Sequence, residues 1–318
     1  MNTYRYEDIC LVPNYSTLKS RSHADTKLRL GDYTFKLPVI PSNMKAVIDQ
    51  SLAAELATSG YMYSMHRFNI DIIKFVDDAN RYGWPVVSIS IGVKQSDKEV
   101  IRSIATAGSK IDYITVDIAH GHCEAMKEMI KYIRERLPRV YIIAGNVSTP
   151  EAVNSLAEWG ADCVKIGIGQ GSPCTTKDKT GFTMPMFTCV EQCAGKTSDI
   201  PIIADGGIRS NGDVAKALTA GATAVMAGGL FASCSDSPAR SINIDGAVYK
   251  AYYGSASFEN KGHKNHIEGV LKKIPANDMT YEQKLTEIQQ DLQSSISYAG
   301  GQDLSAFEEV EYYINKVQ

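Results

Sequence analysis

Short apolar segments recur along the chain, and polar or amphipathic stretches separate them. The eight segments are residues 37–42, 61–66, 85–90, 112–117, 140–145, 161–167, 200–205 and 222–229. Because they are continuously apolar instead of alternating, they predict parallel strands buried on both faces. Between two of them, Met126, Met129, Ile130, Ile133 and Leu137 recur at helical spacing and predict an amphipathic helix.

Helices are expected in the intervals between the strands. Thr149 followed by Pro150 is typical of a helix N-terminus, and residues 70–82 predict a helix between the second and third strands. Eight strands alternating with helices predict an α/β fold, a single (β/α)8 TIM barrel over residues 1–318. A doubly wound sheet is the alternative, but its dinucleotide fingerprint is absent after the first strand.

Composition and charge narrow the class of ligand. The 318 residues carry a formal charge of −3, so we expect neither nucleic acid nor membrane as a partner, and any phosphate must be bound locally. The N-terminus lacks a signal-peptide pattern, and the seven cysteines form no CxxC pair. We therefore expect reduced thiols, a cytoplasmic protein and a small-molecule substrate, with six of the seven cysteines buried and inert.

Paired glycines follow the last two predicted strands. Asp205-Gly206-Gly207 ends the seventh strand, and Gly228-Gly229 ends the eighth. Either pair alone is typical of a tight turn, but in a barrel these two loops commonly hold phosphate through backbone amides. Together they favour a phosphorylated ligand, and Ser172 in the neighbouring loop offers a hydroxyl.

The segment after the sixth strand is a glycine-rich loop, residues 167–185. It places Cys174 on a backbone expected to be exposed, close to Lys177 and Lys179, which favours a reactive thiolate. Cys174 is therefore a candidate nucleophile, with Thr175 or Thr176 as its proton-transfer partner. From the residues alone, proteases, phosphatases and redox switches all stay open.

This loop, GIGQGSPCTTK, resembles the signature GIGPGSxCTTR of the IMP dehydrogenase and GMP reductase family. Gln170 replaces a proline and Lys177 an arginine, and neither change removes a reacting group. Further resemblances run along nearly the whole chain: YEDICLVPNYSTLKSRS, PVIPSNM, MHRF, VDIAHGH, AGNV, ADGGIR and YYGSAS.

Within this family the chain resembles the shorter bacterial GMP reductases more than the dehydrogenases. Dehydrogenases usually carry CBS modules after the second strand, where this chain has only the helix 70–82. They also use an Arg-Tyr pair in a flap, whereas the flap-like region expected at about 240–280 has none and the pair at 81–82 lies elsewhere. His266-Ile267-Glu268-Gly269 and SSISYAGGQDL (294–304) match the reductases.

The resemblance implies a reaction and a set of residues. Cys174 attacks C2 of GMP, ammonia leaves, and NADPH reduces the resulting thioimidate to IMP, with Thr176 and Glu268 as the proton relay. The implied ribose and phosphate ligands are Ser172, Asp205, Gly206, Gly207, Gly228 and Gly229, and the residues beside the base are Gly254, Ser255, Ala256 and Gly269. The implied NADPH contacts are Ser20, Arg21, Arg67, Asp117, Ile118 and Ala119. The resemblance also implies a K+ ion on the carbonyls of Gly167, Gly169 and Cys174, and a homotetramer.

Two other functions remain open at this point. One is an IMP dehydrogenase without CBS modules, which would transfer hydride from IMP to NAD. The other is a catalytically silent barrel that binds purine nucleotides. The Arg-Tyr pair missing from the flap argues against the first, and the intact Cys174, Thr176 and Glu268 argue against the second.

Overall fold

The centre of the protein is a parallel sheet surrounded by helices. The structure is a computed structural model that describes residues 2–197 and 200–315. Among these residues the sheet has seven strands in the order β4-β10-β9-β8-β7-β6-β5, all parallel. They are β4 Val39–Pro41, β5 Ser88–Ile91, β6 Tyr113–Asp117, β7 Tyr141–Val147, β8 Cys163–Ile166, β9 Ile202–Asp205 and β10 Ala224–Ala227. Each lies within or beside a predicted segment, so seven of the eight strand predictions are confirmed.

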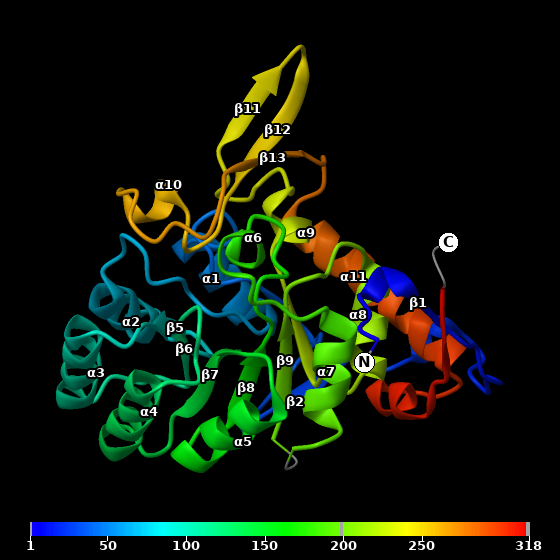
Figure 1. Cartoon of the computed structure of the whole chain (residues 1–318), viewed down its shortest axis with the longest axis horizontal. Helices are drawn as coiled ribbons and strands as arrows, with labels where there is room; N and C mark the ends of the chain where they lie inside the picture. The colour runs from blue at the N-terminus through cyan, green and yellow to red at the C-terminus, as the bar shows by residue number, and fades with distance from the viewer. Residues whose placement is uncertain (1, 198–199, 316–318) are drawn as a thin grey trace.

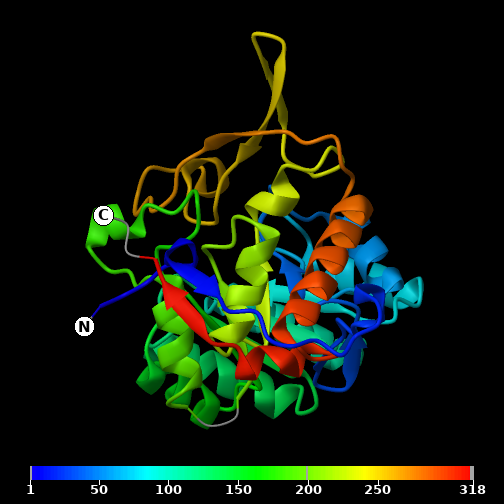
Figure 2. The same ribbon diagram turned by 90° about the vertical axis from the view of Figure 1, so that its right-hand side faces the viewer.

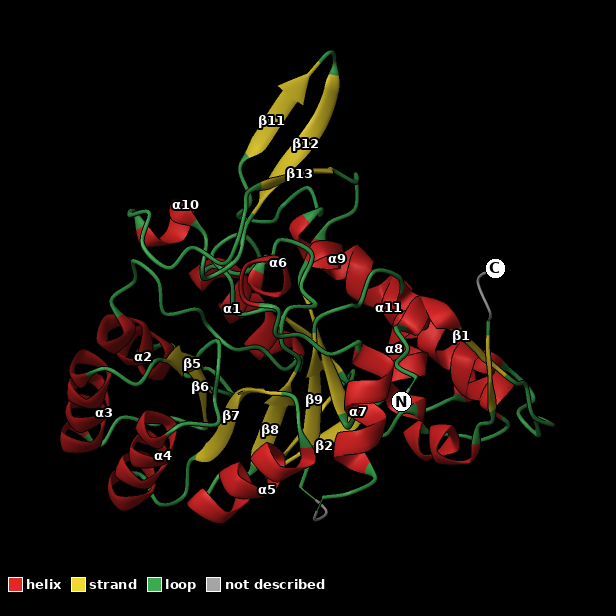
Figure 3. Cartoon of the chain, viewed as in Figure 1, coloured by secondary structure: helices red, strands yellow, loops and turns green. Residues whose placement is uncertain are grey.

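Helices cover the outside of this sheet, as Figure 3 shows in red around the yellow strands. They are α1 Gln50–Ser59, α2 Ile72–Arg81, α3 Gln95–Ala107, α4 Glu124–Arg136, α5 Pro150–Trp159, α7 Met186–Ala194, α8 Asn211–Thr219 and α11 Tyr281–Ala299. Four residues of the predicted stripe are buried in α4, with Met126, Met129, Ile130 and Ile133 all at 0% exposure, whereas Leu137 is the C-cap and is only partly buried. Thr149 caps α5 by accepting a hydrogen bond from Ala152 N, also as predicted.

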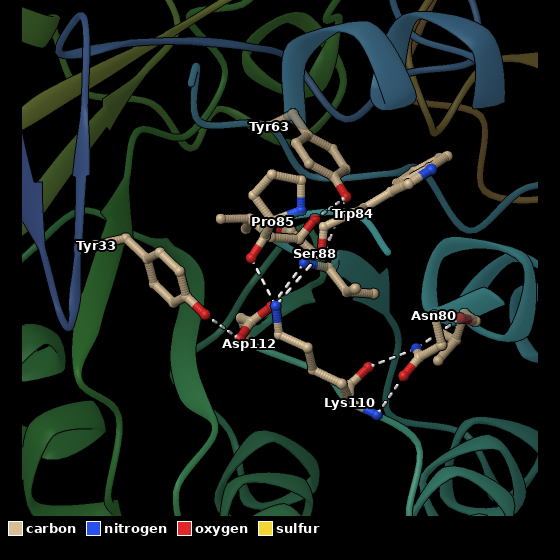
Figure 4. A network of polar contacts seen from close by, with 11 residues as sticks. Tyr33, Tyr63, Asn80, Trp84, Pro85, Ser88, Lys110 and Asp112 are labelled. Carbon is tan, nitrogen blue, oxygen red and sulfur yellow. Dashed lines mark hydrogen bonds and ion pairs between the residues drawn. The ribbon is translucent and has the colours of Figure 1, made fainter. Parts of the chain in front are cut away.

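Segment 61–66 is predicted to be a strand, but it does not form a regular strand in the structure. The segment is buried, but its strand pairing is limited to one bridge, between Met65 and Ile89. The Tyr63 hydroxyl donates to Val86 O and accepts from Ser88 N, so it occupies backbone groups that a longer ladder would use (Figure 4). Ser64 likewise bonds through its side chain, to the hydroxyls of Ser90 and Thr115.

His66, which ends this segment, gives stability a pH dependence. Burial, with the nearby charge of Lys45, lowers the pKa of His66 to about 4. An unfolded histidine titrates near 6.5, so the unfolded chain takes up the proton first as pH falls. The contribution of the neutral His66 to folding stability is therefore complete above about pH 6.5 and is lost as the pH falls toward 4. Between pH 7.5 and pH 5, we expect the free energy of unfolding to fall by about 2 kcal/mol more in the parent than in His66→Gln.

Urea unfolding at the two pH values measures this difference. The exposed His23 provides the control, because His23→Gln should leave the pH dependence of the parent unchanged. Equal losses for the parent and for His66→Gln would contradict the expectation.

Small antiparallel units complete the fold. They pair β1 Ile9–Leu11 with β14 Tyr312–Ile314 and β2 Leu28–Leu30 with β3 Tyr33–Phe35, and join β11 Ser241–Ile244, β12 Ala247–Tyr252 and β13 Lys272–Pro275. Short helices are α6 Thr176–Thr180, α9 Gly229–Ala232 and α10 Phe258–Lys261, with 3-10 turns at Tyr6–Asp8, Arg21–His23 and Leu304–Glu309. The β11–β12 hairpin projects away from the body (Figures 1 and 2).

A polar network joins the amino ends of the strands to the β2–β3 hairpin (Figure 4). Asp112 accepts hydrogen bonds from the Tyr33 hydroxyl at 2.6 Å and from Val87 N at 2.7 Å, and pairs with Lys110 at 3.3 Å. Partial burial and the bond to Asp112 raise the pKa of Tyr33 to about 12. The carboxylate therefore ties the hairpin to two neighbouring strands.

Removing this acceptor should destabilise the fold. We expect Asp112→Ala to lower the free energy of unfolding by about 2–3 kcal/mol, because the Val87 amide and the Tyr33 hydroxyl lose their partner. Urea unfolding measures the change. Glu135→Gln removes a carboxylate from an exposed pair with Arg136 and should change stability by less than about 0.5 kcal/mol. A similar small effect for both variants would show that Asp112 has no such role.

Candidate active site

The predicted cysteine loop follows β8 and contains a short helix. Residues 167–185 are therefore not one uninterrupted loop as expected, because α6 begins at Thr176, directly after the Thr175 cap. Gly169 has φ +75°, and a Cβ there would lie 2.8 Å from the Thr183 hydroxyl oxygen. Gln170 donates to the same hydroxyl at 2.6 Å. This side-chain bond joins the two ends of the loop at the position where the family signature has a proline.

The flap-like segment around Glu268 is hydrogen-bonded to the cysteine loop. Thr175 N donates to Glu268 O and Val270 N donates to Pro173 O, both at 2.9 Å. These two bonds flank an antiparallel bridge between Cys174 and Gly269. In Figure 1, α6 lies below β13. Two segments more than 90 residues apart in the sequence thus form one surface.

Cys174, Thr176 and Glu268 form a continuous chain of hydrogen bonds. The Cys174 Sγ donates to Thr176 Oγ1 at 3.1 Å, and Thr176 Oγ1 donates to Glu268 Oε2 at 2.7 Å. The Thr175 hydroxyl is buried and has no partner among the described residues. The geometry therefore selects Thr176 from the two threonine candidates. A thiol bonded through a hydroxyl to a carboxylate is suited to proton transfer.

Cys174 is partly buried, and this corrects the expectation of an exposed cysteine. The backbone hydrogen bonds to the flap segment account for the reduced exposure of Cys174. All seven cysteines lie in the described part of the chain and all are free thiols. The strand residue Cys163 is buried as expected, as are Cys189, Cys193 and Cys234, whereas Cys10 is exposed and Cys123 is only partly buried.

The two glycine pairs lie in the loops after β9 and β10. Gly206 and Gly207 have φ +112° and +80°, and a Cβ on Gly206 would lie 3.2 Å from Gly171 N in the cysteine loop. A Cβ on Gly228 would lie 2.1 Å from the Tyr252 hydroxyl oxygen. Close approach thus excludes a side chain at Gly228, and positive φ angles favour glycine at Gly206 and Gly207. Gly229 begins the short helix α9, a usual arrangement at barrel phosphate sites.

Tyr252 is a site residue that the sequence analysis missed. It ends β12 and is 4% exposed, and its hydroxyl lies over Gly228. Burial, with a smaller effect of Asp205, raises the pKa of this hydroxyl, so it remains a neutral donor. The motif YYGSAS contained the residue, but no spacing rule points a strand-terminal tyrosine toward a loop 24 positions earlier.

The loop after β12 reaches the same place. Gly254 lies close to Pro173 and Met44, with distances of 3.7 and 4.0 Å from its would-be Cβ. Ala256 O accepts from Glu268 N at 3.0 Å, and Ser255 O accepts from Asn260 Nδ2 at 3.0 Å. The structure therefore brings the residues predicted beside the base together with Cys174 and Glu268.

A buried ion-pair cluster lies below these loops. Lys165 Nζ contacts Asp117 Oδ1 at 2.7 Å and Asp205 Oδ2 at 2.5 Å. Burial alone would lower the pKa of Lys165, but the two carboxylates outweigh it and raise it. Burial likewise opposes the charge of Asp117, yet Lys165 and then Arg67 keep its pKa below the ordinary value. Sequence analysis missed Lys165, although a lysine inside an apolar segment was the available signal.

The predicted cofactor residues form two separate groups. Arg67 Nη2 donates to Asp117 O at 3.3 Å, and Ile118 exchanges backbone bonds with the Gly145–Asn146 segment, so this group, with the adjoining Ala119, lies at the strand ends. Arg21 instead contacts Tyr298, which lies in the last turn of α11. Within the described chain no contact joins Ser20 or Arg21 to the first group.

Comparisons with known proteins agree with this geometry. The family model described as "IMP dehydrogenase / GMP reductase domain" matches residues 3–317. A protein named GMP reductase from Bacillus subtilis (strain 168) is 48% identical over 99% of this chain and 97% of its own length. Another GMP reductase, from Acidovorax sp. (strain JS42), is 46% identical over 99% of this chain and 96% of its own length.

The chain belongs to the IMP dehydrogenase / GMP reductase family. Within this family the flap Arg-Tyr pair is the feature that the sequence analysis attributes to dehydrogenases. Arg81 is the last residue of α2, and Tyr82 directly follows it, 70% exposed. The pair thus lies at the end of an outer helix, whereas the flap segment of this family member supplies Glu268, which accepts from the Thr176 hydroxyl that bonds to Cys174.

Proposed function

We propose that the chain is a GMP reductase that converts GMP, NADPH and one proton to IMP, ammonia and NADP+ through a thioimidate on Cys174. The observation that carries the proposal is the hydrogen-bond chain from the Cys174 thiol through Thr176 to Glu268. Full-length relatives named GMP reductase support the choice of reaction.

The same hydrogen-bond chain accounts for the protons. The Cys174 proton moves to Thr176 Oγ1 as the Thr176 proton moves to the Glu268 carboxylate, which leaves a thiolate. The sulfur adds to C2 of the guanine ring, and the proton held by Glu268 returns through Thr176 to the departing amine. The C–N bond breaks, ammonia carries the former thiol proton, and the C–S bond of the thioimidate remains.

The second half of the reaction frees the cysteine. Bound NADPH supplies a hydride to C2. The electron pair of the C–S bond then returns to sulfur, IMP is released, and the Cys174 thiolate takes up a proton from solvent through the same relay. Because the loop and the flap segment are hydrogen-bonded to each other, the relay stays in contact with the sulfur through both halves.

We assign the nucleotide contacts to the loops that surround Cys174. The ribose and phosphate ligands are Ser172, Asp205, Gly206, Gly207, Gly228 and Gly229, and the residues beside the base are Gly254, Ser255, Ala256 and Gly269. The close packing of Gly206 on the cysteine loop and of Gly228 under Tyr252 supports one shared nucleotide site. Glycine amides there would hold the phosphate without a basic surface.

NADPH would contact Arg67, Asp117, Ile118 and Ala119, which adjoin the nucleotide site. Ser20 and Arg21 belong to this contact only if a second copy of the chain brings them there, which the proposed homotetramer would permit. K+ is a third expected partner. The Gly167 carbonyl already accepts from Asn146 Nδ2 at 2.8 Å, so the carbonyls of Gly167, Gly169 and Cys174 fit a cation only in part, and no step is assigned to it.

We also propose that residues 1–318 form one domain whose sheet closes as an eight-stranded TIM barrel. The Met65–Ile89 bridge places segment 61–66 beside β5, in the gap between the two sheet edges. No helix within the described residues is long and apolar enough to cross a membrane. The free thiols support a reducing compartment, in keeping with cytoplasmic purine metabolism.

A two-substrate comparison tests the proposed function. We expect GMP to drive loss of NADPH absorbance with one ammonia released per NADPH, and IMP with NAD to give no comparable NAD reduction. The opposite pattern would identify a dehydrogenase. Binding of GMP with no turnover in either direction would identify a catalytically silent nucleotide-binding barrel.

A further inference from the structure

Lys165 is a charged residue in the middle of a buried strand. Its side chain is 2% exposed, and its ammonium contacts carboxylates that end β6 and β9, on either side of the β7–β8 pair. A buried ammonium is costly unless it is paired, and removing one partner of such a group usually has a large effect. The position therefore calls for an explanation beyond packing.

The strands β7 and β8 lie so close at this position that β7 has no space for a side chain. Gly145 lies opposite Lys165 in the β7–β8 register. A Cβ on Gly145 would lie 2.3 Å from Lys165 O and 2.8 Å from Lys165 Cβ. Only glycine fits there, because β7 packs directly against the backbone and the Cβ of position 165.

The two oxygens of Asp205 have different surroundings. Oδ2 receives Lys165 Nζ at 2.5 Å and Asn146 Nδ2 at 2.9 Å. Oδ1 accepts no hydrogen bond from any residue that the structure describes, and the side chain is 21% exposed. One oxygen is thus held from below, while the other is free to accept from a ligand above the strand ends.

Lys165 also separates two like charges. The Asp117 and Asp205 oxygens that it contacts are no more than about 5.2 Å apart, because both lie on one nitrogen. Without the ammonium these carboxylates would repel each other and turn away, since like charges at this separation interact strongly in a buried site. The lysine therefore determines where Asp205 points.

We propose that Lys165 is a positioning residue that orients Asp205 toward the ribose hydroxyls of the bound nucleotide and thereby sets the preference for a ribonucleotide. The inference rests on the proposed function, which places the ribose at Asp205. It assigns Lys165 no contact with the nucleotide itself. Because Lys165 acts through one carboxylate, its effect should depend on whether the ligand has hydroxyls for that carboxylate to bind.

Calorimetric binding of IMP, 2′-deoxy-IMP and 3′-deoxy-IMP without cofactor tests this inference on the full chain. We expect the parent to prefer IMP over at least one deoxy analogue by about 30-fold or more, since a polar group left unpaired weakens binding strongly. Lys165→Met should reduce that preference to within about 3-fold, Asp205→Asn should do the same, and the double variant should add little.

A second buried lysine provides the matched control. Lys250 is 3% exposed and its ammonium is held by the carbonyls of Ser235, Ser237 and Ala239, so Lys250→Met should lower stability and keep the preference for IMP. Lys165→Arg, which retains the charge, should restore part of the preference. If thermal unfolding shows that the methionine variant does not fold, Lys165→Arg carries the comparison, and its preference for IMP should lie between that of the parent and that of Asp205→Asn; a preference equal to that of the parent would then contradict the inference.

Two outcomes overturn the inference. One is an equal loss of affinity for all three nucleotides in the Lys165 variants, which indicates a structural role only. The other is a parent that does not distinguish IMP from its deoxy analogues. Failure of the proposed function is separate, because it appears as a parent chain that does not oxidise NADPH with GMP.

Discussion

Replacement of Cys174 by alanine should abolish GMP-dependent NADPH oxidation, with a loss of at least about 10⁴-fold in kcat. The sulfur is the atom that bonds to C2, and alanine offers no substitute nucleophile. Affinity for IMP should change less than about 5-fold, because the glycine loops that are proposed to hold the phosphate are unaffected. Spectrophotometric turnover and calorimetric binding of IMP measure the two quantities.

A trapping experiment sharpens this prediction. The parent mixed with GMP and quenched in acid without NADPH should carry, on Cys174, an adduct with the mass of GMP less ammonia. Cys123→Ala is the matched control, since Cys123 is also partly buried but belongs to the N-cap of α4, and it should retain adduct and activity. Substantial turnover by Cys174→Ala, or an adduct on another residue, would contradict the thioimidate.

Much of the sheet could be predicted because burial on both faces leaves a strong local signal. Each confirmed strand is a short run of apolar residues, and the pattern needs no knowledge of partners. Segment 61–66 has the same signal, yet the Tyr63 hydroxyl bonds to Val86 O, just before β5, and to Ser88 N, the first amide of β5, which a longer ladder would use. Hydropathy reports that a segment is buried, whereas pairing depends on side-chain chemistry in a neighbouring element.

Some residues of the candidate site could likewise be predicted from local sequence, whereas others depend on contacts made in the fold. Cys174 and the glycine pairs could be found because strand ends meet at one rim of a parallel sheet, so local motifs imply proximity. Glu268 became a candidate only through the family resemblance, since 92 residues separate it from Thr176 and no periodicity links them. Lys165 lies within an apolar segment, and its contacts depend on two carboxylates that only the sheet order brings together.

Glu268→Gln should lower kcat by about 10²- to 10⁴-fold and leave the KM for GMP within about 3-fold. The amide has nearly the shape of the carboxylate and its oxygen can still accept from Thr176, but it cannot hold the transferred proton. Thr176→Val should give a loss of similar size, because it interrupts the chain and keeps the volume. The double variant should be little worse than either single one, since both remove the same relay.

Two rates separate a proton relay from a merely structural contact. Ammonia release in a single turnover and alkylation of Cys174 by iodoacetamide should both slow in Glu268→Gln, because the relay removes the thiol proton and later returns it to the amine. Glu259→Gln, on the exposed face of α10 in the same flap-like region, should change neither rate. Parent-like ammonia release in Glu268→Gln would require another acid, whereas slow release with normal alkylation would confine Glu268 to the step that protonates the amine.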